Sequence, residues 1–174
     1  RSTLSSSLAA SYVYKIQILQ ITWAIYFFTV IFILPIMIFF FNKQLVWSNK
    51  PKLQILRGLI LLSANICFFY AISIISLAKA LTLAFVAPLI VTAFSPVMLG
   101  EKVGFRRWTA VIVGFIGSLV VIRPGFVELN FASLAALGTG ILYGFYLIIT
   151  RKLSTSDNPL LTLLFTGVVG LIIT

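Results

Sequence analysis

The charged residues of this chain fall in short clusters, and between them run apolar stretches of about 20 residues, the length with which an α-helix crosses a hydrocarbon core. Only 9% of the 174 residues are charged, 61% are hydrophobic, and the mean hydropathy is +1.15. A water-soluble domain of this length is far less apolar. The pattern predicts an all-α membrane protein, a polytopic helical bundle in which the charges mark the loops.

Seven apolar segments follow from this pattern. They cover roughly residues 2–14, 21–41, 58–77, 80–99, 108–122, 129–150 and the C-terminal stretch after Pro159. The first is too short to span a bilayer, and the last is still apolar at Thr174. We therefore expect that the chain is truncated at both ends.

Thirteen basic residues stand against three acidic ones, which gives a net charge of +10. The basic residues lie at the ends of the apolar segments, where the positive-inside rule places them, so we expect no nucleic-acid partner. Nine of them fall in loops that we predict to be cytoplasmic: Lys43, Lys50, Lys52, Arg57, Lys102, Arg106, Arg107, Arg151 and Lys152. Three fall on the outer side, Lys15, Lys79 and Arg123, and Arg1 is assigned to neither side.

Residues for catalysis are scarce. The chain has no histidine, its one cysteine is Cys67 inside an apolar segment, and Glu101, Glu128 and Asp157 all stand at segment ends or in loops. No acid–base pair or metal cluster can form from these groups within the membrane. We expect neither an enzyme, nor a bound metal, nor a cofactor.

Small residues recur four apart in two segments, Ala110, Gly114 and Ser118 in one and Ala136, Gly140 and Gly144 in another. Ridges of this kind let membrane helices approach one another closely. We expect helix packing at both ridges.

A polar stripe shares one face of residues 129–150. It consists of Thr139, Tyr143, Tyr146 and Thr150, which are spaced by four, three and four residues. The stripe either lines a solute cavity, or its hydroxyls bond to their own helix while the tyrosines fill the bundle core.

Two other segments also carry polar groups. Asn65 either joins helices or contacts a solute, because an amide in hydrocarbon is costly without a partner. Thr92 lies near the face of Pro88 and Pro96, and prolines of this kind break or kink helices beside transporter sites. Our candidate substrate-binding residues are Asn65, Tyr70, Thr92, Thr139, Tyr143 and Tyr146.

An internal echo relates the first two segments to the sixth and seventh, since each pair is joined by a short polar link. Each segment lies five segments before its equivalent. Because five is an odd number of membrane crossings, the second copy is inverted in the membrane relative to the first. This arrangement is typical of secondary transporters.

Residues 78–124 resemble the EamA family of the drug/metabolite transporter superfamily. The resemblance rests on the corner from Leu99-Gly100-Glu101-Lys102 to Arg107-Trp108 and on Gly114-Phe115-Ile116-Gly117, with Arg57-Gly58 as a further match. Residues 134–174 are similar to the start of the family's second repeat.

The resemblance implies a ten-helix transporter of two inverted five-helix repeats, with residues 1–125 as the first repeat and residues 126–174 as the start of the second. It implies a secondary transporter that moves a small metabolite, an amino acid or a related solute, by alternating access. The partners would be the solute and the lipid bilayer, with a bacterial inner membrane as the location. The alternative is a structural or assembly subunit of the membrane that transports nothing.

The predicted topology can be tested with introduced cysteines. At Lys50 and Arg106 we expect labelling by an impermeant reagent only after the membrane is opened, and at Glu128 labelling in intact cells, because basic loops are retained inside. Labelling at Lys50 from outside would overturn this orientation.

Overall fold

The computed structural model describes residues 2–40, 48–122 and 130–174, with side chains at 16–39, 48–117, 119–120 and 130–174. This part of the chain is helical and contains no strand. Its elements are α1 Ser2–Phe40, α2 Pro51–Ile72, α3 Leu77–Ala84, α4 Ala87–Leu99, α5 Phe105–Ile122, α6 Phe131–Leu153 and α7 Pro159–Ile173. Four stretches are long and apolar enough to cross a bilayer: Ile16–Phe39, Pro51–Ile72, Leu77–Leu99 and Phe131–Leu153. The predicted all-α, multi-span architecture is confirmed.

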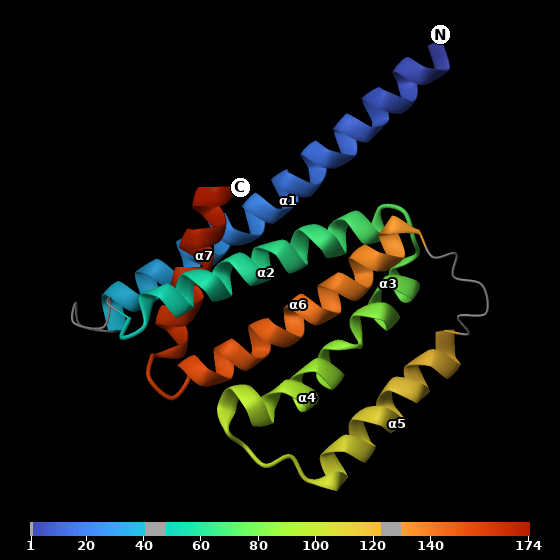
Figure 1. Cartoon of the computed structure of the whole chain (residues 1–174). Coiled ribbons are helices and arrows are strands. Elements are labelled where there is room, and N and C mark those ends of the chain that lie inside the picture. Colours follow the sequence, from blue (N-terminus) through green and yellow to red (C-terminus); the bar gives the residue numbers. More distant parts are fainter. Residues whose placement is uncertain (1, 41–47, 123–129) are drawn as a thin grey trace.

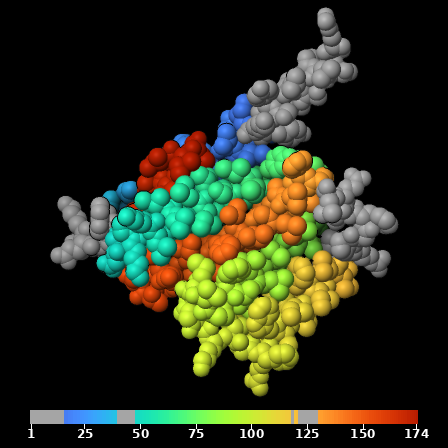
Figure 2. Space-filling view, in the orientation of Figure 1, coloured from blue at the N-terminus to red at the C-terminus, as the bar shows by residue number. Residues whose placement is uncertain are grey.

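Helices α2 and α6 form the centre of the bundle and run antiparallel, side by side (Figure 1). On one side α1 and α7 pack against each other and against α2. On the other side α3 and α4 pack against α6, and α5 lies at the edge beyond them. The space-filling view shows α2 and α6 in continuous contact along their lengths (Figure 2).

The predicted break between the first two segments is wrong. Helix α1 continues through Lys15 and Gln20 for 39 residues, and its N-terminal part projects beyond the bundle (Figure 1). Such a helix is about 58 Å long, roughly twice the thickness of a hydrocarbon core. The polar link contains neither Gly nor Pro, so nothing in it ends a helix. Because α1 does not turn as α6 and α7 do, the internal echo and the inverted repeat are not confirmed.

Helix α2 begins earlier than predicted. Pro51 occupies its first turn, so Gln54 and Arg57 lie inside the helix instead of in a loop. Proline is favoured there because its missing N–H would have no partner in a helix and its φ is already helical.

The predicted break of the fourth segment is present between α3 and α4, at Phe85 and Val86. Pro88 has no N–H to donate to the carbonyl of Ala84, four residues earlier. Gly140 of α6 packs at this place, where a Cβ would lie 2.7 Å from that carbonyl oxygen. Because Gly140 has no side chain, α6 can approach the Ala84 carbonyl that Pro88 leaves without a helical partner.

The two small-residue ridges have different outcomes. The α6 ridge is confirmed, because Ala136 is fully buried and a Cβ on Gly144 would lie 2.8 Å from the Ile90 side chain. The α5 ridge is not, because a Cβ on Gly114 would meet no atom within 4 Å and Ala110 is exposed. The side chain of Ser118 lies outside the described residues. The repeat of small residues was the same in both helices, but only α6 has neighbours on that face.

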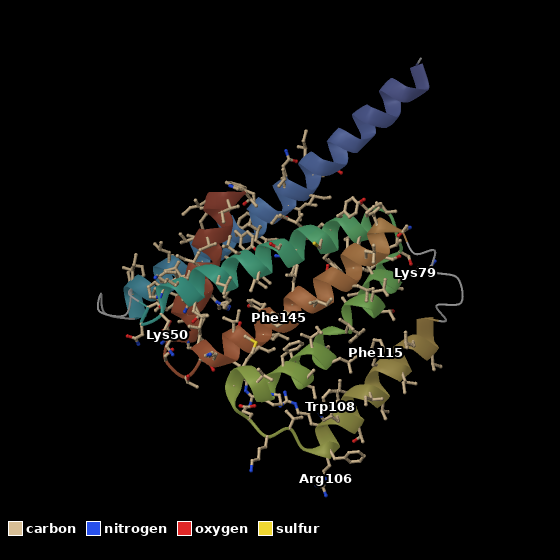
Figure 3. The ribbon with its side chains drawn as sticks, in the orientation of Figure 1. Lys50, Lys79, Arg106, Trp108, Phe115 and Phe145 are labelled. Carbon is tan, nitrogen blue, oxygen red and sulfur yellow. The ribbon has the colours of Figure 1, made fainter. Side chains whose placement is uncertain are left out.

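Three of the predicted cytoplasmic loops gather at one end of the bundle. Arg151, after the stripe of α6, forms an ion pair of 2.9 Å with Glu101, and Asn49 bonds to the α6–α7 loop. Lys50 and Lys79, predicted on opposite sides of the membrane, lie at opposite ends (Figure 3). Lys43, Arg123 and Glu128 are outside the described residues, as is the side chain of Lys15.

The packing of α6 can be tested by a matched pair of substitutions. Gly140→Leu should prevent folding or lower stability by at least about 3 kcal/mol, because the new side chain meets backbone of α3. Gly114→Leu should leave stability unchanged or raise it by up to about 1 kcal/mol, because its site is open and leucine favours a helix more than glycine does. Yield and melting temperature in detergent measure both, and equal losses in the two variants would contradict this assignment.

Candidate functional site

Arg57 is the most deeply buried charged side chain of the described residues, with 1% of its surface exposed. Its guanidinium reaches two other helices. The Nε donates to Thr150 Oγ1 of α6 at 2.7 Å, and Nη2 donates to Tyr146 Oη at 2.9 Å. The Nη1 donates to the Thr162 carbonyl and to Thr166 Oγ1 of α7, both at 2.8 Å. One side chain thus ties α2 to α6 and α7.

The hydroxyls around Arg57 are oriented to accept its protons. Thr150 Oγ1 donates to the Tyr146 carbonyl at 2.7 Å, and Thr166 Oγ1 donates to the Thr162 carbonyl at 2.9 Å. Each threonine therefore gives its own proton to its helix and turns its lone pairs to the guanidinium. A buried charge is tolerated only where such bonds replace its lost hydration. In the described part of the chain, Arg57 has no carboxylate within 4 Å.

A second polar cluster lies beside the first, at the end of the bundle that holds the basic loops. Asp157, in the α6–α7 loop, accepts hydrogen bonds from Ser48 Oγ, from Gln54 Nε2 at 2.8 Å and from the backbone N–H of Asn49 at 3.2 Å. Gln54 Nε2 also donates to Thr162 Oγ1 at 3.2 Å, which links this cluster to the residue that Arg57 contacts.

The pKa of Asp157 is set by opposing effects. Burial acts to raise it, but the hydrogen bonds from Ser48, Gln54 and Asn49, together with the charge of Lys50, outweigh burial and hold the pKa below its ordinary value of 3.8. The carboxylate is therefore ionised at neutral pH and fastens the start of α2 to the start of α7.

Two of the predicted site residues come together as a stack. The rings of Tyr143 and Tyr146 have their centres 5.5 Å apart with an angle of 25° between planes. On the Tyr146 ring lies the Arg57 guanidinium, with its Cζ 4.8 Å from the ring centre. Tyr146 is half-buried, whereas 42% of Tyr143 is exposed.

The other four predicted residues do not join this stack. Asn65 donates to Tyr26 Oη of α1 at 3.1 Å, so it joins helices. Thr139 is buried and donates to the Ala135 carbonyl of its own helix at 3.0 Å. Tyr70 is exposed near the end of α2, and Thr92 is buried on α4.

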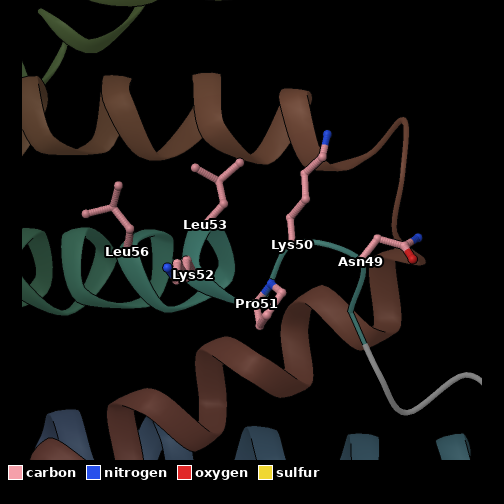
Figure 4. A pocket seen from close by; sticks show the side chains of 6 residues that line it. All are labelled: Asn49, Lys50, Pro51, Lys52, Leu53 and Leu56. Carbon is pink, nitrogen blue, oxygen red and sulfur yellow. The ribbon is translucent and has the colours of Figure 1, made fainter.

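Three pockets of the described residues lie away from the six candidates. One, of about 480 Å³, is lined by Asn49, Lys50, Pro51, Lys52, Leu53 and Leu56, with Lys50, Leu53 and Leu56 pointing to the same side of α2 (Figure 4). Another, of about 410 Å³, surrounds the ion pair of Glu101 and Arg151. A third, of about 440 Å³, lies between residues 16–24 of α1 and Thr174. No group of three potential metal ligands occurs in the described parts.

Sequence reasoning missed Arg57, Gln54 and Asp157. The sequence predicts Arg57 in a loop because the apolar run starts only at Gly58. The signal that could have found it is Pro51: a helix that begins at this proline carries Gln54 and Arg57 in its first two turns. Thr162 and Thr166 lie one turn apart on α7. Their hydroxyls accept hydrogen bonds from Gln54 and Arg57, respectively.

The sequence profile of the EamA-like transporter family matches residues 3–123. An S-adenosylmethionine uptake transporter of Rickettsia prowazekii (strain Madrid E) is 24% identical over 155 residues, which cover 89% of this chain and 52% of the relative. A riboflavin transporter of Vibrio cholerae is 36% identical over 81 residues, covering 47% of this chain and 27% of the relative.

A pseudopaline exporter of Pseudomonas aeruginosa is 34% identical over 77 residues, covering 44% of this chain and 27% of the relative. The chain spans about half the length of the S-adenosylmethionine transporters that it matches. No solved structure matches it.

The Asp157 cluster predicts a pH dependence of stability. Because the folded pKa is lowered, the carboxylate stabilises the fold above its unfolded pKa of about 3.8, and this contribution is lost as the pH falls through the folded value. Asp157→Asn should lower stability at neutral pH by about 1–3 kcal/mol, because charge-assisted hydrogen bonds are lost. It should also flatten the fall in stability below about pH 4.

Melting temperatures in detergent from neutral to acid pH measure this effect. Glu101→Gln is the control, since its ion pair with Arg151 is partly exposed and contributes about 0–1 kcal/mol. A wild-type melting temperature for Asp157→Asn at neutral pH would show that the cluster does not stabilise the fold.

Proposed function

Because this chain belongs to the EamA-like transporter family, we propose that it carries a small metabolite across a membrane by alternating access. The observation that carries the proposal is the family match over residues 3–123, in a chain with several helices able to span a bilayer. The chain is an integral multi-pass membrane protein, and its bacterial relatives point to the inner membrane.

The names of two relatives support the class of solute that we propose. Two of them are named as transporters of S-adenosylmethionine and of riboflavin, which are polar metabolites of moderate size. We propose a metabolite of this kind for the present chain, and an amino acid or related solute remains within the proposal. Such a carrier requires no cofactor.

Tyr143 is the best candidate for a solute contact. It stands thirteenth among the 23 residues of α6, so its hydroxyl is near the middle of the span. A tyrosine at a helix end can turn its hydroxyl to the interface, but one at the midpoint cannot reach it. Tyr143 is nevertheless 42% exposed, and the described residues provide its hydroxyl with no hydrogen bond. A solute or its water is the partner that suits this group.

The mechanism that we propose has one repeat rocking against the other, within a ten-helix arrangement of two inverted five-helix repeats. With residues 1–125 in the first repeat and 126–174 in the second, α2 belongs to one repeat and α6 and α7 to the other. The bonds of Arg57 and Asp157 then join the two repeats at the end that carries the basic loops. Access from that end requires these bonds to open or to move as a unit.

A structural subunit is the alternative function. Its buried polar groups would serve packing alone, and the bonds of Asn65 and Thr139 agree with that role. The exposed hydroxyl of Tyr143 is the feature that favours transport.

Two conservative substitutions separate these functions. Tyr143→Phe should reduce uptake per molecule of inserted protein several-fold, about 1 kcal/mol for one hydrogen bond, with unchanged abundance. Tyr146→Phe should lower uptake and also stability, by about 1–3 kcal/mol, because it leaves a buried N–H of Arg57 without its acceptor.

The measurement is uptake of labelled S-adenosylmethionine, riboflavin and a panel of amino acids into cells or vesicles that contain the natural full-length protein. Uptake of none of these solutes above vesicles without the protein would reject the proposed transport of such metabolites. Unchanged uptake kinetics in Tyr143→Phe would show that the Tyr143 hydroxyl does not contact the solute.

A further inference from the structure

Three side chains form a connected group at the middle of α6. The Arg57 guanidinium lies on one face of the Tyr146 ring, and the Tyr143 ring lies next to Tyr146 with nearly parallel planes. Arg57 is buried, Tyr146 is half-buried and Tyr143 is exposed. Exposure therefore rises from Arg57 in the interior of the bundle through Tyr146 to Tyr143.

Arg57 holds the Tyr146 ring in place. Its Nη2 donates to Tyr146 Oη at 2.9 Å, so the Tyr146 ring is held by its hydroxyl and by its face. The guanidinium itself is held by three threonines of α6 and α7. The Tyr143 ring contacts this fixed Tyr146 ring, so Tyr143 loses little conformational entropy when another group binds to it.

The exposed ring is at a depth where a lipid-facing tyrosine is unusual. Tyr143 is near the midpoint of α6, far from both interfaces where tyrosines of membrane helices gather. With 42% of its surface exposed, Tyr143 can take a further aromatic contact, and aromatic groups prefer offset stacked or edge-to-face contacts with one another.

We infer that Tyr143 stacks a flat ring of the transported solute, and that the substrate class is a metabolite with a planar aromatic or heteroaromatic ring. This inference rests on the proposed function and adds the chemical class to it. Arg57 and Tyr146 are positioning residues, which hold the Tyr143 ring and do not touch the solute. Stacking on an aromatic side chain accepts any flat ring, because each has a π-face, so the site would select by shape and not by one hydrogen-bond pattern.

The test uses the natural full-length protein, purified in detergent, with riboflavin as a flat fluorescent probe. Stacking on tyrosine quenches flavin fluorescence, so wild type should give saturable quenching. Tyr143→Phe keeps the ring and loses only the hydroxyl, so it should weaken riboflavin binding by no more than the several-fold expected for one hydrogen bond. Tyr143→Leu keeps bulk and loses the ring, and should weaken binding by about tenfold or more.

Phe131→Leu is the matched control, because it also replaces an exposed aromatic residue of α6 by leucine, at the far end of the helix from the stack. Its riboflavin affinity should equal that of wild type. Tyr143→Leu with the affinity of Tyr143→Phe would overturn the inference. So would a lower melting temperature in Tyr143→Leu with unchanged affinity, which would mean that another helix covers the ring.

Uptake separates this inference from the proposed function. Uptake of aliphatic amino acids without binding or uptake of riboflavin or S-adenosylmethionine would reject the flat-ring class and leave the transporter standing. Absence of uptake for every solute of the panel, together with absence of riboflavin quenching, would overturn both.

Discussion

A guanidinium inside an apolar bundle stabilises the fold only if its N–H groups find acceptors there, and Arg57 has found them on two separate helices. Four bonds lead from it to Tyr146, Thr150, Thr162 and Thr166. Removing one acceptor would leave a charged donor unpaired at a cost of about 1–3 kcal/mol or more. The relative positions of α2, α6 and α7 therefore depend on this one side chain.

Close backbone approach makes the arrangement possible. A Cβ on Gly58, the residue after Arg57, would lie 2.9 Å from Val169 Cγ1, so the glycine lets α7 come near enough for Arg57 to reach it. On the opposite side Gly140 and Gly144 bring α3 and α4 against α6. The centre of the bundle is thus joined by polar bonds on one flank and by small residues on the other, while α5 lies outside both.

The parts of the fold that could be predicted are those that local sequence determines. Span lengths follow from apolar runs, and the break before Pro88 follows from a missing N–H. The α6 ridge follows from small residues four apart, but the same pattern at Gly114 meets open space. The spacing of residues shows which of them share a helix face, but it does not show whether another helix packs against that face. Arg57 could not be placed as a buried residue from its own surroundings, since its acceptors are about 90 to 110 residues away in the sequence. The polar residues between Lys15 and Gln20 suggest a break, but α1 continues through them because polar side chains do not by themselves end a helix.

The predicted polar stripe of α6 divides in the structure according to what satisfies each hydroxyl. Toward one end Thr139 bonds to its own backbone, and toward the other Tyr146 and Thr150 accept from Arg57. Tyr143 lies between these satisfied groups and has a ring contact but no hydrogen bond among the described residues. A stripe that served packing alone would be expected to satisfy its central hydroxyl as well as its ends, because an unpaired polar group in a membrane is costly. Arg57 therefore holds Tyr146 in place but does not cover Tyr143. Of these two neighbouring tyrosines, Tyr146 is the rigid support and Tyr143 is the exposed contact surface.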